Sequence, residues 1–222
     1  MFKQTTIAII DSGIGGLSVL KALINKYGAG NYIYFADNLL MPYGDHKRSF
    51  IKTRVESIME KLKNEYFADL IIIACNTASS CLNGEMENVL KLTFENNITY
   101  LTTPLTKRNL KNVNVIADKT LAKDIEDNIL NGKKLKNMIK THVERLRLCK
   151  YNQIILGCTH YELAVDLFKE ICPEIEFVNN STQIIDKIKI KAEELNVKII
   201  LSKPNKSYYE KILKILNKKK DG

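Results

Sequence analysis

The chain reads LIIIACNT over residues 70–77 and IILGCTH over residues 154–160. Each stretch begins with a continuous apolar run, which is typical of a strand buried on both faces in a parallel sheet. Each run then ends at a cysteine, Cys75 or Cys158, that is followed by polar residues. Open α/β sheets bind their ligands beyond the carboxyl ends of their strands. The two stretches therefore predict an α/β fold with a cysteine at the ligand-binding end of two strands.

Two cysteines in matched settings indicate one site with a sulfur on either side of a substrate. That arrangement suits the transfer of a proton across a planar intermediate, which is the chemistry of racemisation. Either thiol taken alone would more often be a packing residue, because free cysteine is among the most buried residue types. The pair favours a chemical role, since hydroxyl or amide side chains follow both cysteines where a core strand would continue apolar.

Strand and helix patterns alternate on both sides of these stretches. In the N-terminal part, apolar runs at 7–10, 32–36 and 70–74 are separated by helical patterns at 17–27 and 48–65. This is the βαβαβ order of a parallel sheet with right-handed crossovers. Further along, we predict strands at 98–101, 113–116, 154–156, 175–178 and 197–201, and helices at 118–150 with a break at 131–132, 161–171, 181–195 and 207–217.

The two halves share one order of features: an apolar run, a cysteine, a polar pair and a helix. We therefore predict an α/β fold of two pseudo-symmetric lobes with parallel sheets and with the active site between them. Residues 1–97 together with 183–222 would form the first lobe, and residues 98–182 would form the second.

The composition is that of a globular protein, with 222 residues of which 45% are hydrophobic and 27% charged. No apolar run approaches the roughly 18 residues that span a bilayer, and the residues before the first strand lack the pattern of a signal peptide. Five cysteines without a CxxC pair argue against a disulfide framework and against a structural zinc site. We expect a cytoplasmic protein that uses no membrane and no metal.

The formal net charge of +9 comes mostly from lysine, including the run Lys218–Lys220. Proteins that bind single-stranded nucleic acid combine a basic groove with interleaved aromatic residues, and this sequence shows no such stripe. The charge is more consistent with solvated helix faces, and we expect no nucleic-acid partner. A positive field would still attract an anionic small-molecule substrate.

The segment DSGIGG at residues 11–16 joins the first strand to the first helix. Its glycines leave backbone N–H groups able to face an anion at a helix N-terminus, and Asp37 stands where a dinucleotide-binding motif has its ribose-binding acid. However, Ser18 replaces the third glycine of that motif, and Asp11 would repel a pyrophosphate. A nicotinamide-dependent enzyme is therefore a distant alternative.

Asp11 would instead attract an ammonium group, while nearby donors would bind carboxylates. The donors come from Ser12, Asn76, Thr77, Thr159 and the backbone of the turn Pro42-Tyr43-Gly44. A site that binds an amino acid needs a carboxylate to attract the ammonium group and hydrogen-bond donors to bind the carboxylates. The alternative for residues 42–44 is a plain surface turn.

Four segments in this order resemble the glutamate racemases of the aspartate/glutamate racemase superfamily: IIDSGIGGL at 9–17, ADN at 36–38 with MPYG at 41–44, ACNTAS at 74–79, and LGCTHY at 156–161. The resemblance implies two α/β lobes and a reaction without a cofactor, in which Cys75 and Cys158 are the two bases. It further implies that Asp11 and His160 assist the thiols, and that Ser12, Pro42, Tyr43, Gly44, Asn76, Thr77 and Thr159 hold the substrate.

The second lobe departs from the family pattern. The interval between the cysteines is shorter than is usual in the family, and the family's acidic residue from this lobe has no aligned counterpart; Glu126 and Glu144 are the candidates. Asp118 stands in the turn where the family has a threonine, although Thr120 could substitute for it.

The resemblance predicts an isomerase that interconverts L- and D-glutamate, supplies D-glutamate for peptidoglycan, and is compatible with a homodimer. Two alternatives stay open. One is a racemase of aspartate or another acidic amino acid, and the other is a non-catalytic relative with a binding role.

Overall fold

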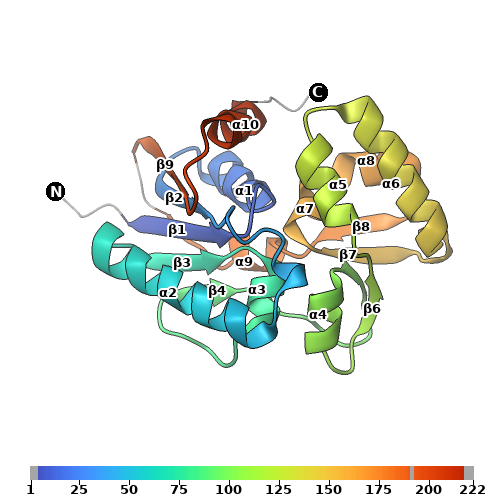
Figure 1. Cartoon of the computed structure of the whole chain (residues 1–222), viewed down its shortest axis with the longest axis horizontal. Coiled ribbons are helices and arrows are strands. Elements are labelled where there is room, and N and C mark those ends of the chain that lie inside the picture. Colours follow the sequence, from blue (N-terminus) through green and yellow to red (C-terminus); the bar gives the residue numbers. More distant parts are fainter. Residues whose placement is uncertain (1–4, 191–192, 218–222) are drawn as a thin grey trace.

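Two separate parallel sheets organise the chain in the computed structural model, which describes residues 5–190 and 193–217 (Figure 1). The first sheet has the order β4-β3-β1-β2-β9 and the second has the order β6-β5-β7-β8. The strands are β1 (Thr6–Asp11), β2 (Gly30–Ala36), β3 (Leu70–Ile73), β4 (Val89–Lys91), β5 (Thr99–Thr102), β6 (Asn114–Ala117), β7 (Gln153–Gly157), β8 (Glu176–Asn179) and β9 (Leu195–Leu201). Every strand pair within the described residues is parallel, which confirms the predicted fold class.

Alternate residues of β1 enter two different cores. Ile7 and Ile9 belong to one buried cluster, while Ala8 and Ile10 belong to another on the opposite face of the sheet. Helices α1 (Leu17–Tyr27), α9 (Thr182–Ile185) and α10 (Lys206–Asn217) cover the first face, and α2 (Arg48–Tyr66) with α3 (Asn76–Cys81) covers the second. Burial on both faces explains why the strands of this sheet are apolar throughout.

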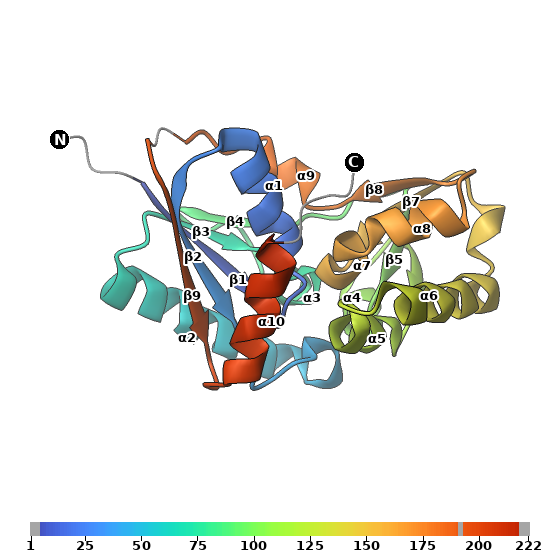
Figure 2. The same cartoon turned by 90° about the horizontal axis from the view of Figure 1, so that it is seen from above.

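The second sheet carries its own core. Strands β5, β7 and β8 pack against α5 (Leu121–Asn128), α6 (Gly132–Leu146), α7 (Thr159–Leu163) and α8 (Val165–Ile171). Helix α4 (Pro104–Asn109) follows β5 and contacts α3 of the first lobe. After β8 the chain returns to the first sheet, where β9 pairs with β2, and α10 then packs on α1 (Figure 2).

Most predicted elements are present, with two differences. The helix predicted over residues 161–171 is broken at Ala164 into α7 and α8. The helix predicted over residues 181–195 is wrong over 186–190, because α9 ends at Ile185, and at Leu195, where β9 begins. Residues 191–192 of this prediction lie outside the described residues. Ile188 and Ile190 both pack on the first core, and residues two apart cannot share one face of a helix. Helices α3 and α4 and strand β4 are short elements that the periodicity did not predict.

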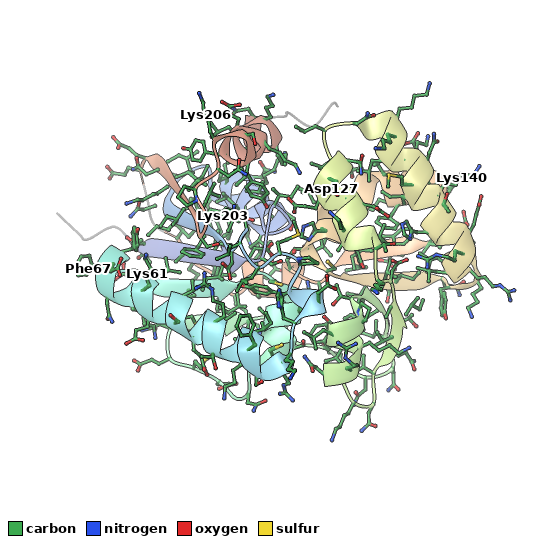
Figure 3. The ribbon with its side chains drawn as sticks, in the orientation of Figure 1. Lys61, Phe67, Asp127, Lys140, Lys203 and Lys206 are labelled. Carbon is green, nitrogen blue, oxygen red and sulfur yellow. The ribbon has the colours of Figure 1, made fainter. Side chains whose placement is uncertain are left out.

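Several lysines lie in ion pairs on exposed helix faces. Lys61 pairs with Glu65 and Lys140 with Glu144, each across one helical turn, and Lys61 and Lys140 extend outward from α2 and α6 (Figure 3). This arrangement supports the interpretation of the charge as solvated helix surface; the run Lys218–Lys220 lies outside the described residues. Within the described residues, no helix is both long and apolar enough to cross a membrane.

Candidate active site

The two matched cysteines lie at the carboxyl ends of their strands, as predicted. Cys75 follows β3 and precedes α3, while Cys158 follows β7 and precedes α7. Both side chains are buried. Burial raises the pKa of the Cys75 thiol far above its usual range, and the neighbouring Asp11 and Cys158 raise it further. The Ala74 N–H donates to the Ile10 carbonyl, which places Cys75 beside Asp11, and Asp11 in turn accepts a hydrogen bond from Thr159, the residue after Cys158. The two cysteines therefore lie at one junction, although they belong to different sheets.

Asp11 sits beside Cys75 and links the two lobes. Its Oδ1 accepts a hydrogen bond from the Gly13 N–H at 2.9 Å, and its Oδ2 accepts one from the Thr159 hydroxyl at 2.9 Å. Burial outweighs these hydrogen bonds and raises the pKa of the Asp11 carboxyl. The Cys75 thiol also lies 3.9 Å from the Ser12 hydroxyl. One thiol is thus accompanied by a buried carboxyl group whose pKa is raised.

A histidine and a carboxylate accompany the other thiol. Nδ1 of His160 lies 3.9 Å from Sγ of Cys158, and Nε2 lies 2.6 Å from Oε2 of Glu126. Burial alone would lower the pKa of His160, but the interactions with Cys158 and Glu126 raise it well above its usual value. Burial alone would raise the pKa of Glu126, but the interactions with His160 dominate and lower it to about 2. The pair is therefore an imidazolium and a carboxylate.

This contact identifies the acidic residue of the second lobe that the sequence left open. Glu126 is buried on α5, whereas Glu144 is exposed on α6 and lies 4.0 Å from Lys140. The Glu126 carboxylate also accepts a hydrogen bond from the Ile14 N–H at 3.2 Å. Glu126, rather than Glu144, is therefore the carboxylate at the site.

Helix α10 adds two residues to this side of the site that the sequence analysis missed. Lys211 donates to the backbone carbonyl of Glu126, and its Nζ lies 3.5 Å from the carboxylate Oε1. Tyr208 is placed near the same carboxylate, and among the described residues its buried hydroxyl has no hydrogen-bond partner. Both residues belong to an ordinary amphipathic pattern with no motif, so no local signal could have found them.

The glycine loop allows the two lobes to approach each other closely. A Cβ atom on Gly15 would lie 2.7 Å from Nδ1 of His160, and one on Gly13 would lie 2.7 Å from Oε2 of Glu126. Both distances are too short for a side chain, so glycine is needed at these positions for packing. The N–H groups of Gly13 and Ile14 bind the chain's own carboxylates rather than being free for a phosphate.

Asp37, the other part of the dinucleotide-like pattern, also has an internal role. Its carboxylate accepts hydrogen bonds from Arg54 at 2.8 and 2.9 Å and from the Tyr43 hydroxyl at 2.8 Å. Burial would raise the pKa of Asp37, but the interactions with Arg54 and its other partners hold it below the usual value. Internal contacts thus account for both features that suggested a dinucleotide.

An unpaired donor lies at the start of α3. The side-chain oxygen of Asn76 accepts a hydrogen bond from Asn180 at 2.7 Å. Among the described residues, the buried Nδ2 of Asn76 has no acceptor. A buried donor without a partner costs about 1–3 kcal/mol, so it marks a place where a ligand can bind.

A cluster of three hydroxyls lies where α3 meets α4. Thr77, Thr103 and Thr106 place their Oγ1 atoms 3.0 to 3.1 Å from one another. The turn that contains Pro42, Tyr43 and Gly44 is adjacent, because a Cβ on Gly44 would lie 3.7 Å from Cβ of Thr103. The Tyr43 side chain is buried against Asp37, so this residue can offer only its backbone to a ligand.

Asp118 does not point an uncompensated charge into the site. Its Oδ1 accepts hydrogen bonds from the N–H groups of Thr120 and Leu121 at 2.8 and 3.0 Å, and its Oδ2 lies 2.7 Å from Nδ1 of His142. Arg145 also pairs with it. Burial would raise the pKa of Asp118, but hydrogen bonding to His142 and these N–H groups lowers it to about 2. This aspartate therefore fixes the start of α5 to α6.

Comparison with known proteins finds similar sequences and solved structures, although no family model matches the chain. Over 233 residues it is 30% identical to the glutamate racemase of Buchnera aphidicola, and the match covers 89% of this chain and 90% of the relative. It is 28% identical over 245 residues to glutamate racemase 3 of Caldanaerobacter subterraneus, and this match covers 95% of this chain and 90% of the relative. The crystal structure of Escherichia coli glutamate racemase, in complex with L-glutamate and an activator, has the same fold, with a TM-score of 0.77, 21% identity and 96% coverage of each chain.

Proposed function

The chain belongs to the glutamate racemase family, and from this premise we propose that it interconverts L- and D-glutamate by a two-base transfer of the α-proton between Cys75 and Cys158. One observation carries the proposal. Two buried thiols follow strands of different sheets and lie at one junction between them. Cys75 lies beside Asp11, and Cys158 lies beside His160, which is held by Glu126. A catalyst that must reach both faces of one carbon atom needs this arrangement.

Substrate binding would use the polar groups between the lobes. The free Nδ2 of Asn76 and the hydroxyl of Ser12 are donors suited to the α-carboxylate. The Thr159 hydroxyl would join them by turning from Asp11 toward the substrate. Asp11 would interact with the ammonium group, and the positive charge would favour the ionised carboxylate that burial disfavours in the free protein.

The side-chain carboxylate of glutamate would bind at the hydroxyl cluster formed by Thr77, Thr103 and Thr106. This cluster lies at the junction of α3 and α4, next to the turn at residues 42–44. Hydroxyls can reorient from bonding one another to donating toward an anion, so the cluster can accept a carboxylate without a nearby positive side chain. Pro42, Tyr43 and Gly44 would contribute backbone groups.

Proton transfer would proceed in two steps. One cysteine, as thiolate, removes the α-proton and leaves a planar carbanion; the opposite thiol then donates its proton to the other face. A thiolate must form first, because it is the reactive state of cysteine. At Cys158, His160 would hold the thiol proton as an imidazolium paired with the Glu126 carboxylate, which leaves Cys158 as the thiolate. At Cys75, Asp11 would serve as the proton acceptor.

Side chains of the protein both remove the α-proton and return a proton to the opposite face, so the proposed reaction uses no cofactor. The lobes would be residues 1–97 with 183–222, and residues 98–182, and their separation would admit the substrate. The product D-glutamate would serve peptidoglycan synthesis.

The proposal is tested by incubating the pure protein with L-glutamate in D₂O without a cofactor. We expect exchange of the α-proton, followed by NMR, together with formation of D-glutamate. The variants Cys75→Ser and Cys158→Ser should each abolish racemisation. Cys81→Ser is the matched control, because Cys81 is also a buried cysteine and its sulfur accepts a hydrogen bond from Asn109. Racemisation by either active-site variant would overturn the two-base mechanism. A parallel assay with aspartate separates the two substrates.

A further inference from the structure

A second group of thiol and carboxylate side chains lies outside the proposed racemase site. Cys149 is in the short helix η2 (Leu148–Lys150), Cys172 directly follows α8, and Glu174 lies in the turn before β8. The two sulfur atoms are 2.9 Å apart. One ligand atom from each of the three residues lies within 4.8 Å of the others.

This group lies at the opposite end of the second sheet from Cys158. Cys149 precedes β7 and Glu174 precedes β8, whereas Cys158 follows β7. Cys149 and Glu174 are exposed and Cys172 is buried, so an ion from solvent can reach the group. The residues therefore form a separate site with its own access.

We propose that Cys149, Cys172 and Glu174 bind a thiophilic divalent cation of the zinc class, with water as the fourth ligand. Two thiolates and one carboxylate are ligand types that zinc prefers. The absence of a CxxC pair argued against such a site in the sequence, but the fold brings together two cysteines 23 residues apart.

A disulfide is the competing interpretation, and the sulfur separation alone does not decide between them. Two thiolates on a tetrahedral zinc ion lie about 3.8 Å apart, and a disulfide bond is about 2.05 Å, so either state requires a similar movement. Glu174 favours the cation, because a carboxylate is a third ligand for a metal and has no function in a disulfide. A divalent cation would also offset the negative charge that the two thiolates and the carboxylate carry when they bind it.

The thiolate, not the thiol, is the form of cysteine that binds a metal ion. A bound cation deprotonates its thiol ligands, and the two protons pass to solvent.

Cation binding would hold together the two ends of the segment that carries one of the proposed bases. Residues 149 and 172 enclose β7, α7 and α8, and therefore Cys158 and His160. The ion would fix both ends of this segment without contacting the racemase site. We therefore expect zinc to stabilise the folded protein and to leave its turnover unchanged.

The test uses chelator-treated, reduced protein titrated with Co²⁺, which gives a thiolate charge-transfer band, and with Zn²⁺, which displaces it. The double variant Cys75→Ala/Cys158→Ala removes the two thiols of the racemase site, which leaves Cys81 as the one thiol outside the proposed group. We expect one equivalent to bind this double variant and to raise its melting temperature. Adding Cys149→Ala should abolish the band, and adding Glu174→Gln should weaken binding; both side chains are exposed, so these variants should fold. Adding Cys81→Ser should change nothing.

Three results of the Co²⁺ titration would overturn the proposal. The first is that no band appears with one equivalent of Co²⁺, and the second is that the band persists after Cys149→Ala. The third is a band that the wild type shows and the Cys75→Ala/Cys158→Ala variant lacks, because it would place the ion in the racemase site. A thiol titration of freshly purified protein would instead favour a disulfide if it counts three free thiols before reduction and five after it.

Discussion

Nε2 of His160 lies 2.6 Å from Oε2 of Glu126, and this contact joins α7 to α5 within the second lobe. It orients the imidazole so that its other nitrogen faces the sulfur of Cys158, 3.9 Å away. The same carboxylate accepts a hydrogen bond from the Ile14 N–H of the glycine loop. Glu126 therefore positions the histidine and also joins the two lobes at the site.

Replacing Glu126 by Gln should slow the proton transfer that involves Cys158. The amide cannot stabilise an imidazolium as a carboxylate does, and we expect a loss of roughly 10²-fold or more in kcat/KM. The equilibrium constant between enantiomers is one, so kcat/KM must fall equally in both directions. The asymmetry should appear in the α-deuterium isotope effect, which should increase for the enantiomer that Cys158 deprotonates.

The control for this variant is Glu144→Gln, which changes an exposed glutamate on the neighbouring helix. It should leave both the rate and the isotope effects unchanged. Isotope effects that change by the same amount for both enantiomers in Glu126→Gln would contradict the assignment of Glu126 and His160 to one face of the substrate.

Replacing Gly15 by Ala should separate the lobes at the site. The added Cβ would lie 2.7 Å from Nδ1 and 2.8 Å from the backbone nitrogen of His160, so the two segments must move apart. Displacement of catalytic groups by about 1 Å can cost roughly 10²-fold in rate, and we expect a loss of this size in kcat. Gly132→Ala is the control, because a Cβ there meets nothing within 4 Å. Normal turnover by Gly15→Ala would show that the loop does not approach His160 this closely.

Two residues on α10 should differ in their contribution to stability. Lys211→Ala removes an ion pair and a hydrogen bond to Glu126, and we expect the free energy of unfolding to fall by about 1–3 kcal/mol. Tyr208→Phe removes a buried hydroxyl without a hydrogen-bond partner among the described residues, so the change should stay within about 1 kcal/mol. Urea unfolding measures both. A larger loss for Tyr208→Phe than for Lys211→Ala would contradict these assignments.

Glu162 should make stability depend on pH. Its carboxyl group is buried, accepts hydrogen bonds from Ser18 and Ser181, and connects α1 of the first lobe to α7 of the second. Burial raises its pKa from 4.5 to about 7. Between these values the folded state binds the proton more tightly than the unfolded state, so stability falls as the pH rises from 4.5 to about 7.

Glu162→Gln should remove this dependence, because the amide is neutral and can still bond both serines. Relative to the variant, the wild type should lose about 3 kcal/mol of stability between pH 4 and pH 8. Chemical unfolding at the two pH values measures the difference. A constant difference between the proteins would show that Glu162 titrates near its usual pKa.

The local pattern of the sequence determined the strands and the position of both cysteines. The apolar runs of β1, β3 and β7 specify buried parallel strands, and the residue that ends such a run necessarily lies at the ligand-binding end of the sheet. Cys75, Cys158 and Asp11 could be selected in this way, and His160 follows two residues after Cys158. All of these signals lie within a few residues along the chain.

Only the tertiary structure decided which side chains complete the site. Glu126, Lys211 and Asn180 come from α5, α10 and the segment after β8, and no motif marks them. The packing of each helix determines which of its polar residues reaches a partner far away in the sequence. The burial that sets the pKa values of these groups, and the meeting of Cys149 with Cys172, likewise depend on how distant segments pack, which periodicity along the chain does not specify.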